Sequence, residues 1–503
     1  MQQRLTAHSI FLHWQTPVLL TIFFAIRLLS FFIASHPIIQ AALVFVLLMI
    51  LGIAYFKNPH WAFYLVIGEL FLGGAGHYLE FINLSVRTLV IATFLVLWTL
   101  HTINDERLGR NIRINRKLNI ALLIFYFLLI ASAVNGIRHD HALTNIIQDL
   151  MPFLYLPLIF PAYQLLAKQE TQEYFVRLVI VFLIGSAIFS VFTFVLFGSG
   201  IAELQGPFYQ WFRDVSMGKI TAMGNNFFRV VLPEHLLITP IILVISSLLM
   251  RNEKHHKMWR LLLFLAAAIL VLNFSRGYFL ALFAGLLILK YKHQWRRWFI
   301  ISATTIGLVV LIFTSFAIFA SGGKTFGWEL LGVRVVSLTA PQIEVSAATR
   351  MMVLPAILEI IKDNPIAGVG LGATVTFMNT LTYEIITTRH FDWGYLEMLA
   401  ELGVFGALAL LSLYLFTAVK LNKKINHASD WHDFYVGLLA STFAMLVINI
   451  TSPALFHVFG IIFLVLAIAI AAKPIDIFER LITLLYRIFN RIKKGGKELL
   501  VHR

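Results

Sequence analysis

Long apolar stretches recur along the whole chain and restrict what it can fold into. A stretch of about 18 or more apolar residues is long enough to cross a bilayer as a helix. Hydrophobic residues make up 59% of the chain and charged residues only 13%, which excludes a soluble enzyme or a nucleic-acid-binding module. The sequence therefore predicts an all-α polytopic membrane protein with about 12–14 transmembrane helices. The candidate segments are 15–33, 38–56, 61–81, 85–104, 117–134, 148–167, 178–197, 233–250, 298–320, 396–420, 434–451 and 454–472, with 261–289 in addition.

Lysine and arginine are concentrated between some of these segments, which indicates how the segments are oriented. Loops rich in these residues stay on the cytoplasmic side. If all the dense clusters face the cytoplasm, segment 261–289 must cross twice as a hairpin, with Arg276 at its outer turn. The net charge of +15 then reflects this bias and not a nucleic-acid-binding surface. Both termini are expected in the cytoplasm. The clusters lie at 107–117, 251–260, 290–297, 420–424 and after 473.

This topology divides the chain into membrane segments, two outer loops and a tail. The tail has apolar residues at three- and four-residue spacing, with arginines between them. It is expected to lie as an amphipathic helix on the anionic lipids of the inner leaflet. The parts are 1–197 (N-terminal helices), 198–232 (outer loop), 233–320 (helices with the hairpin), 321–395 (large outer loop), 396–472 (C-terminal helices) and 473–503 (basic tail).

Several kinds of chemistry have no sequence signal in this chain. Cysteine is absent, so no disulfide framework, thiol nucleophile or cysteine-ligated metal is possible. There is no nucleotide-binding P-loop and no metalloprotease motif. His255 and His256 are adjacent, without the spacing of metal ligands. We therefore expect neither a metal nor a cofactor.

Arg276 interrupts an otherwise apolar stretch. An arginine near the bilayer centre costs about 2.5–3.5 kcal/mol on insertion scales, and such residues are functional hypotheses by default. A diphosphate suits the guanidinium fork. The alternative is a structural ion pair with an acid of the outer side.

The two outer loops add further basic residues on the same side. Lys219 and Arg229 end the first loop, and Arg350 lies in the second. This gives a group of basic side chains on a face that is otherwise not basic, and we expect it to bind an anionic ligand.

The second outer loop contains a predicted helix followed by a glycine-rich turn. Residues 348–364 indicate a helix against the membrane surface, with Pro355 in its first turns and Asn364-Pro365 ending it. Gly368, Gly370 and Gly372 follow. They allow the backbone either to approach a ligand closely or to pack as a re-entrant turn.

A histidine precedes the next membrane helix. His390 lies between Arg389 and Asp392, and Glu397 and Glu401 follow at the start of that helix. A histidine at such a mouth can act as a base near neutral pH, oriented by one of these acids. It can equally be a solvated or hydrogen-bonded interfacial residue.

Charged residues in the first segments support a different class of function. Arg27, Glu69, His77 and Glu80 lie in or beside membrane segments. They could form the proton relay of a transporter or flippase, or simply pair between helices.

The order of these motifs resembles the O-antigen ligase and polymerase superfamily. The matching pieces are Ser275-Arg276-Gly277 before an apolar helix, Arg350 opening the segment that ends in the glycine turn, and His390 shortly before Tyr395-Leu396-Glu397. The resemblance covers about 210–410. It implies a GT-C-like, all-helical glycosyltransferase of the bacterial inner membrane with its active site facing the periplasm.

The resemblance also implies a reaction. A glycan on undecaprenyl diphosphate would be transferred to a hydroxyl of lipid A-core (ligase) or of a growing glycan (O-antigen or exopolysaccharide polymerase). Arg276 and Arg350 would bind the diphosphate and stabilise its charge, and His390 would be the general base. Transfer would invert the anomeric configuration without a metal. The further substrate-binding candidates are Arg229, Lys219, Arg389, Asp392, Gly368, Gly370 and Gly372.

Ligase and polymerase stay open at this point, with a slight preference for the ligase. Family ligases commonly have His-Asn directly before the Tyr-Leu-Glu run, whereas Phe-Asp-Trp-Gly separates His390 from Tyr395 here.

Overall fold

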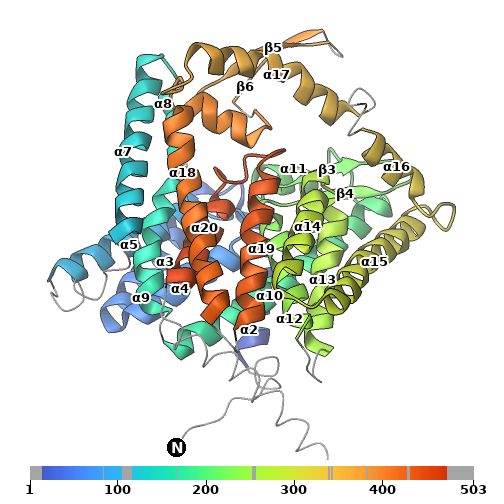
Figure 1. Ribbon diagram of the computed structural model, residues 1–503, viewed down its shortest axis with the longest axis horizontal. Coiled ribbons are helices and arrows are strands. Elements are labelled where there is room, and N and C mark those ends of the chain that lie inside the picture. The colour runs from blue at the N-terminus through green and yellow to red at the C-terminus, as the bar shows by residue number, and fades with distance from the viewer. Residues whose placement is uncertain are drawn as a thin grey trace, which may run out of the picture.

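The computed structural model is predominantly helical (Figure 1). The predicted basic tail, 473–503, lies outside the residues that it describes. The described residues are 14–82, 84–104, 116–166, 168–251, 257–337, 340, 344–380, 383–389, 391–427 and 431–472.

The helices follow one another through the membrane segments, with short 3₁₀ turns between some of them. In the first half they are α2 (Gln15–Ile33), α3 (Pro37–Lys57), α4 (Pro59–Leu72), α5 (Val86–Asn104), α7 (Arg116–Arg138), α8 (Leu143–Leu150), η1 (Met151–Leu158), α9 (Ile159–Leu165), α10 (Gln169–Gly198) and α11 (Pro207–Asp214). In the second half they are η2 (Pro233–Leu237), α12 (Ile238–Leu249), α13 (Lys257–Asn273), α14 (Arg276–Leu289), η3 (Lys290–Lys292), α15 (Trp295–Ala320), α16 (Trp328–Val336), α17 (Val345–Asp363), α18 (Gly394–His427), α19 (His432–Ile448) and α20 (Val458–Ala472).

Eight of the described helical segments are long and apolar enough to cross a membrane. This confirms the all-α polytopic membrane fold and identifies a multi-pass membrane protein. The number is below the predicted 12–14 because several apolar segments fold into shorter helices. Pro233–Leu249, His432–Ile448 and Val458–Ala472 have only 10–17 helical residues, whereas a bilayer core calls for about 20.

The long apolar segment 261–289 is divided into two helices. α13 ends at Asn273 and α14 begins at Arg276, because Phe274 adopts a left-handed backbone (φ 47°) and Ser275 is extended. A Cβ on Gly285 of α14 would lie 2.3 Å from Leu243 of α12, so α14 returns along α12. Arg276 therefore stands at the turn between two helices and not in the middle of one.

Short two-stranded hairpins, which the sequence did not indicate, add to the outer loops. β3 (Lys219–Ala222) pairs with β4 (Phe228–Val231), and β5 (Val375–Asn379) pairs with β6 (Glu384–Thr388), both antiparallel. A third, β1 (Glu80–Phe81) with β2 (Leu84–Ser85), is smaller. In Figure 1, β5, β6 and α17 form a layer over one end of the helices.

Helix α17 starts earlier than the sequence indicated. It begins at Val345, so Pro355 lies in its interior and not in its first turns. Asn364 caps the helix, in agreement with the predicted stop at Asn364-Pro365.

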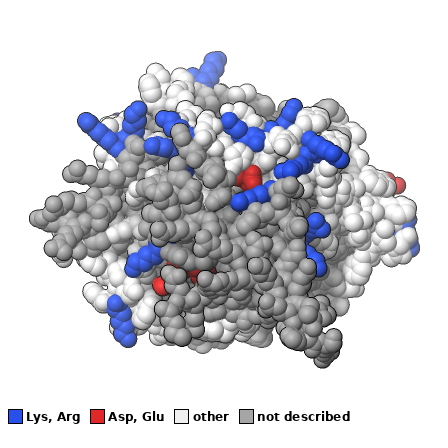
Figure 2. Space-filling view, turned by 60° about the horizontal axis from the view of Figure 1, so that its bottom comes forward, with Lys and Arg blue, Asp and Glu red and all other residues white. Residues whose placement is uncertain are grey.

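Charged side chains are distributed unevenly over the surface. Figure 2 shows the end of the molecule opposite to α17 and the β5–β6 hairpin, where Lys and Arg clearly outnumber Asp and Glu among the described residues. An excess of basic residues at one end is what positive-inside bias produces.

The glycine turn between α17 and β5 is packed against two membrane helices. Gly370 has φ 95°, and its amide donates to the backbone carbonyl of Glu401 at 3.1 Å. A Cβ at this position would lie 2.0 Å from the backbone nitrogen of Gly136 in α7. The backbones of α7, α18 and the turn can therefore meet only if this residue is glycine.

We predict that Gly370→Ala destabilises the fold by about 2 kcal/mol or more, since it combines a positive φ with a backbone clash. Gly307→Ala is the control: Gly307 lies in α15 with nothing within 4 Å of an added Cβ, and alanine there favours the helix by up to about 1 kcal/mol. Thermal unfolding of the purified full chain in detergent measures both. Equal shifts in Tm for the two variants would contradict the packing argument.

Candidate functional site

Four arginines from four separate elements approach one another near the start of α14. They are Arg229 of β4, Arg276 at the start of α14, Arg334 of α16 and Arg350 of α17, called here the arginine cluster. Burial and the positive charges of Arg334 and Arg350 lower the pKa of Arg229 to about 10. Burial lowers the pKa of Arg334 as well, and Arg350 contributes to that shift. Charges that lower a neighbouring pKa in this way lie in its vicinity.

One carboxylate, Glu344, joins two members of the cluster. Its Oε2 lies 3.0 Å from Nη1 of Arg276, and its Oε1 forms an ion pair with Nη1 of Arg334. Ser337 completes the contact, since its hydroxyl lies 2.6 Å from Nη1 of Arg276 and 3.2 Å from Oε2 of Glu344. Arg276 thus has the outer acid that the ion-pair alternative required.

The ion pairs leave part of the cluster's charge uncompensated. Glu344 and Asp392 are the carboxylates that pair with it among the described residues, against four guanidinium groups. Nε of Arg334 and Nε of Arg350 are buried and donate to no acceptor in the described part of the chain. An anion with several oxygens would satisfy these donors.

Arg350 also anchors the segment before α18. Its backbone carbonyl accepts from Trp393 Nε1 at 3.1 Å, and its Nε lies 3.7 Å from Asp392. Arg389, at the other end of this segment, pairs with Asp149 of α8 at 2.7 Å. His390 itself lies outside the described residues. The described residues on its two sides are nevertheless held to α17 and α8.

The glycines contact the helices rather than the cluster. The amide of Gly372 donates to Asp149 Oδ2 at 2.9 Å, and the carbonyl of Gly368 accepts from Asn135 Nδ2 at 2.7 Å. These contacts favour the packed re-entrant turn over close approach to a ligand.

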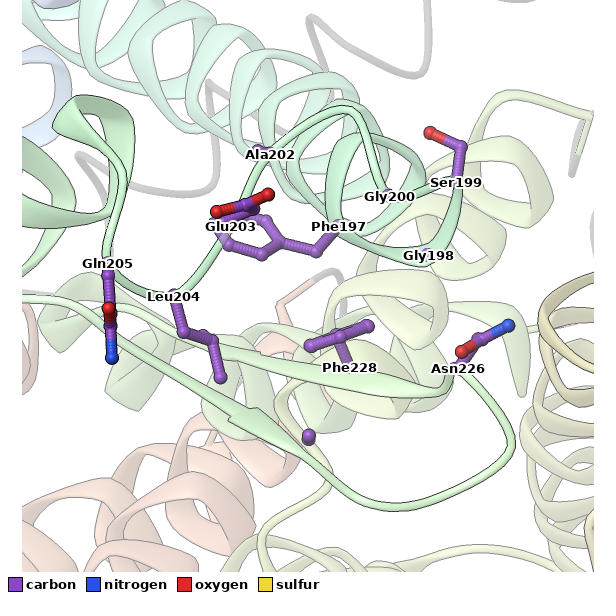
Figure 3. Close-up of a pocket in the computed structure, with 11 residues that line it drawn as sticks. Phe197, Gly198, Ser199, Gly200, Ala202, Glu203, Leu204, Gln205, Asn226 and Phe228 are labelled. Carbon is purple, nitrogen blue, oxygen red and sulfur yellow. The ribbon is translucent and has the colours of Figure 1, made fainter.

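Lys219 is exposed on β3, and no hydrogen bond or ion pair among the described residues joins it to the cluster. The adjacent hollow of about 540 Å³ lies beside the same hairpin (Figure 3). It is lined by Phe228 and Ala222, which are paired across the strands. Neighbouring residues of a strand point to opposite faces, so the hollow lies on the face of β4 away from Arg229. It is therefore separate from the arginine cluster.

The charged residues proposed for a proton relay form separate ion pairs. Arg27 pairs with Glu234 at 3.2 Å, and Glu69 with Arg87 at 2.8 Å, both pairs buried. His77 lies 2.6 Å from Glu80, and both are partly exposed. These contacts agree with simple pairing of charges, the alternative to a proton relay, since no hydrogen bond or ion pair among the described residues links one pair to the next.

Sequence reasoning missed Arg334, Glu344 and Asp149. Arg334 and Glu344 lie in the predicted large outer loop, on the same predicted side as Arg276. Their position in that loop was the available signal that they could contact Arg276. Asp149 gave no such signal, because it precedes its partner Arg389 by 240 residues.

We predict that Glu69→Gln destabilises the protein by about 3–5 kcal/mol, because it leaves the Arg87 charge buried without its partner. Glu80→Gln removes a partly exposed pair and is expected to cost no more than about 1 kcal/mol. Thermal unfolding of both variants compares them. A stable Glu69→Gln protein with lost function would instead support the relay.

Comparison with known proteins bears on the segment that carries most of the site. No curated protein matches the chain. The family model described as O-antigen ligase matches residues 261–411, which run from α13 into α18 and include Arg276, Arg334 and Arg350. The match supports a function of the O-antigen ligase or polymerase type, on lipid-linked glycans. It also confirms the resemblance of the motifs and supports membership of this chain in the O-antigen ligase and polymerase superfamily.

Proposed function

We propose that the chain is a glycosyltransferase of the bacterial inner membrane that transfers a glycan from undecaprenyl diphosphate to a hydroxyl of lipid A-core. The observation that carries this proposal is the arginine cluster, with its excess of positive charge and its two buried Nε groups that donate no hydrogen bond among the described residues. A diphosphate diester is a dianion with several acceptor oxygens, and guanidinium forks suit such a group.

Binding of the diphosphate would exchange partners within the cluster. In the structure Glu344 accepts from Arg276 and Arg334. Diphosphate oxygens take over these donors, and Glu344 keeps its contact with Ser337 or turns towards solvent. The partly buried setting strengthens the new charge-assisted hydrogen bonds relative to those in water.

The transfer of the glycan depends on stabilising the negative charge that develops on the departing diphosphate. The glycosidic bond to the diphosphate breaks as the acceptor oxygen attacks the anomeric carbon from the opposite side, which inverts the configuration. Arg276 and Arg350 stabilise the negative charge on the departing diphosphate. His390 takes the proton of the acceptor hydroxyl. The guanidinium groups supply the positive charge at the leaving group, so the proposed reaction needs no metal.

The orientation of the protein is part of the proposal. The basic end seen in Figure 2 faces the cytoplasm, together with both termini, in accord with positive-inside bias. The outer elements α16 and α17, which carry Arg334 and Arg350, then face the periplasm. The donor headgroup reaches the cluster from that side.

We expect Arg276→Ala and Arg350→Ala each to lower the transfer rate about 100-fold or more, the usual cost of removing one donor to a developing anion. Arg213→Ala is the matched control, since this arginine of α11 is 57% exposed and pairs with the neighbouring Asp214. The rate is measured with purified protein and a polyprenyl-diphosphate-linked glycan. If both variants keep the wild-type rate, the cluster is not the donor site.

A polymerase remains the second candidate, because the family model does not separate the two activities. Purified protein is given donor alone, or donor with lipid A-core, and the products are resolved by size. A single transfer that needs lipid A-core supports the ligase. A ladder from donor alone identifies a polymerase and rejects the ligase. Intact donor in both reactions would favour the transporter or flippase class.

A further inference from the structure

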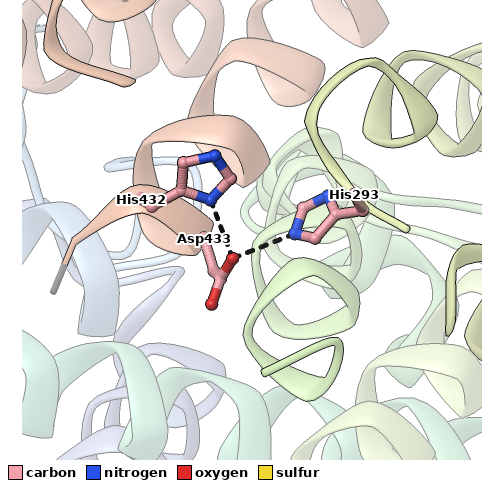
Figure 4. A group of neighbouring side chains, drawn as sticks. All are labelled: His293, His432 and Asp433. Carbon is pink, nitrogen blue, oxygen red and sulfur yellow. Dashed lines mark hydrogen bonds and ion pairs between the residues drawn. The ribbon is translucent and has the colours of Figure 1, made fainter. Parts of the chain in front are cut away.

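A group of potential metal ligands lies at the end of α14 remote from Arg276. Within the described residues, His293, His432 and Asp433 have ligand atoms that all lie within 4.8 Å of one another (Figure 4). His293 follows η3, and the other two begin α19. We call them the histidine–aspartate group. We propose that this group binds a divalent transition-metal ion such as Zn²⁺.

The hydrogen bonds of His293 carry the proposal. Its Nδ1 lies 2.7 Å from the backbone carbonyl of Leu289, which can only accept, so Nδ1 carries a hydrogen. In a neutral ring Nε2 then has a lone pair, and it points at Asp433 Oδ1 from 3.0 Å. Two acceptors cannot face each other at this distance without a positive group between them. Either a second proton or a metal ion fills that role.

The second histidine favours the metal ion. His432 Nδ1 also lies 3.0 Å from Asp433 Oδ1, so two imidazole nitrogens converge on one carboxylate oxygen. Two neutral imidazoles and a carboxylate are a usual ligand set for Zn²⁺, whose fourth position is commonly water. The His432 side chain is 28% exposed and that of His293 only 7%. This leaves a solvent-facing side for that water.

The ligands are held in place before any ion arrives. A metal-binding histidine usually donates its other ring N–H to a carbonyl or carboxylate, and Leu289 supplies that acceptor here. The backbone carbonyl of Asp433 accepts from Ser247 of α12 at 2.5 Å. A bound ion would therefore fasten the start of α19 to the end of α14, alongside α12.

Nearby basic residues affect both explanations of the His293–Asp433 contact, a protonated His293 and a bound metal ion. Lys290, Lys292, Arg296 and Arg297 flank His293 in sequence. Their positive charges oppose an added proton and, about twice as strongly, a divalent metal ion. A proton on His293 would form one hydrogen bond, to the carboxylate oxygen that His432 also contacts. A metal ion would bind all three ligand atoms. The geometry thus favours the metal.

Zinc binding by the full chain tests the proposal. The protein is purified in detergent with a tag that contains no histidine, stripped with EDTA, and titrated with Zn²⁺ in a calorimeter. We expect one ion bound per chain, and His293→Ala or Asp433→Asn to weaken its binding more than about tenfold, the least that loss of an outer hydrogen-bond partner costs. His36→Ala, an exposed histidine that contacts Ser35, is the control and should bind as the wild type does.

A second measurement covers variants that fold poorly. EDTA should lower the Tm of the wild-type chain, added Zn²⁺ should restore it, and the milder variant His432→Ala should show neither change. If the wild type binds Zn²⁺ no more tightly than His293→Ala, and its Tm does not respond to EDTA, the group is a protonated histidine paired with Asp433 and the metal site is rejected.

Discussion

The ion pairs of Glu344 hold the outer layer to the membrane helices. The carboxylate contacts Arg276 at the head of α14 and Arg334 of α16, and it begins the segment that continues into α17. An arginine at the head of an apolar helix needs such a partner, because its charge is costly to move away from water. Glu344 therefore fixes where α16 and α17 lie above the helix bundle, and with them the positions of Arg334 and Arg350.

The same contact explains how four arginines can lie close together in the folded chain. Four guanidinium groups repel one another when partly buried, and the lowered pKa of Arg229 reflects this repulsion together with burial. Glu344 and Asp392 reduce the repulsion but do not remove it. The folded cluster therefore keeps residual positive charge, which would suit the dianionic headgroup of the proposed donor.

Helix α14 connects two regions of different chemistry. Arg276 stands at its first residue, and Leu289 at its last residue orients His293. Near Arg276, a Cβ on Gly277 would lie 2.3 Å from Thr451, just after α19. A metal ion at the far end would hold the same two helices together there. The position of Arg276 would then depend on contacts at both ends of α14.

The sequence by itself determined the membrane fold, the break at Arg276 and three of the four arginines of the cluster, Arg229, Arg276 and Arg350. These follow from apolar length, from the cost of a charge in an apolar stretch and from the order of the motifs. Only the tertiary structure decided which charges meet. Glu344 joins Arg276 and Arg334, Asp149 joins Arg389, and His293 meets His432 and Asp433 across 139 or more residues. Pairs of this kind carry no local periodicity, because they are selected by the packing of helices that are remote in sequence. The same packing holds Gly370 against α7 and α18.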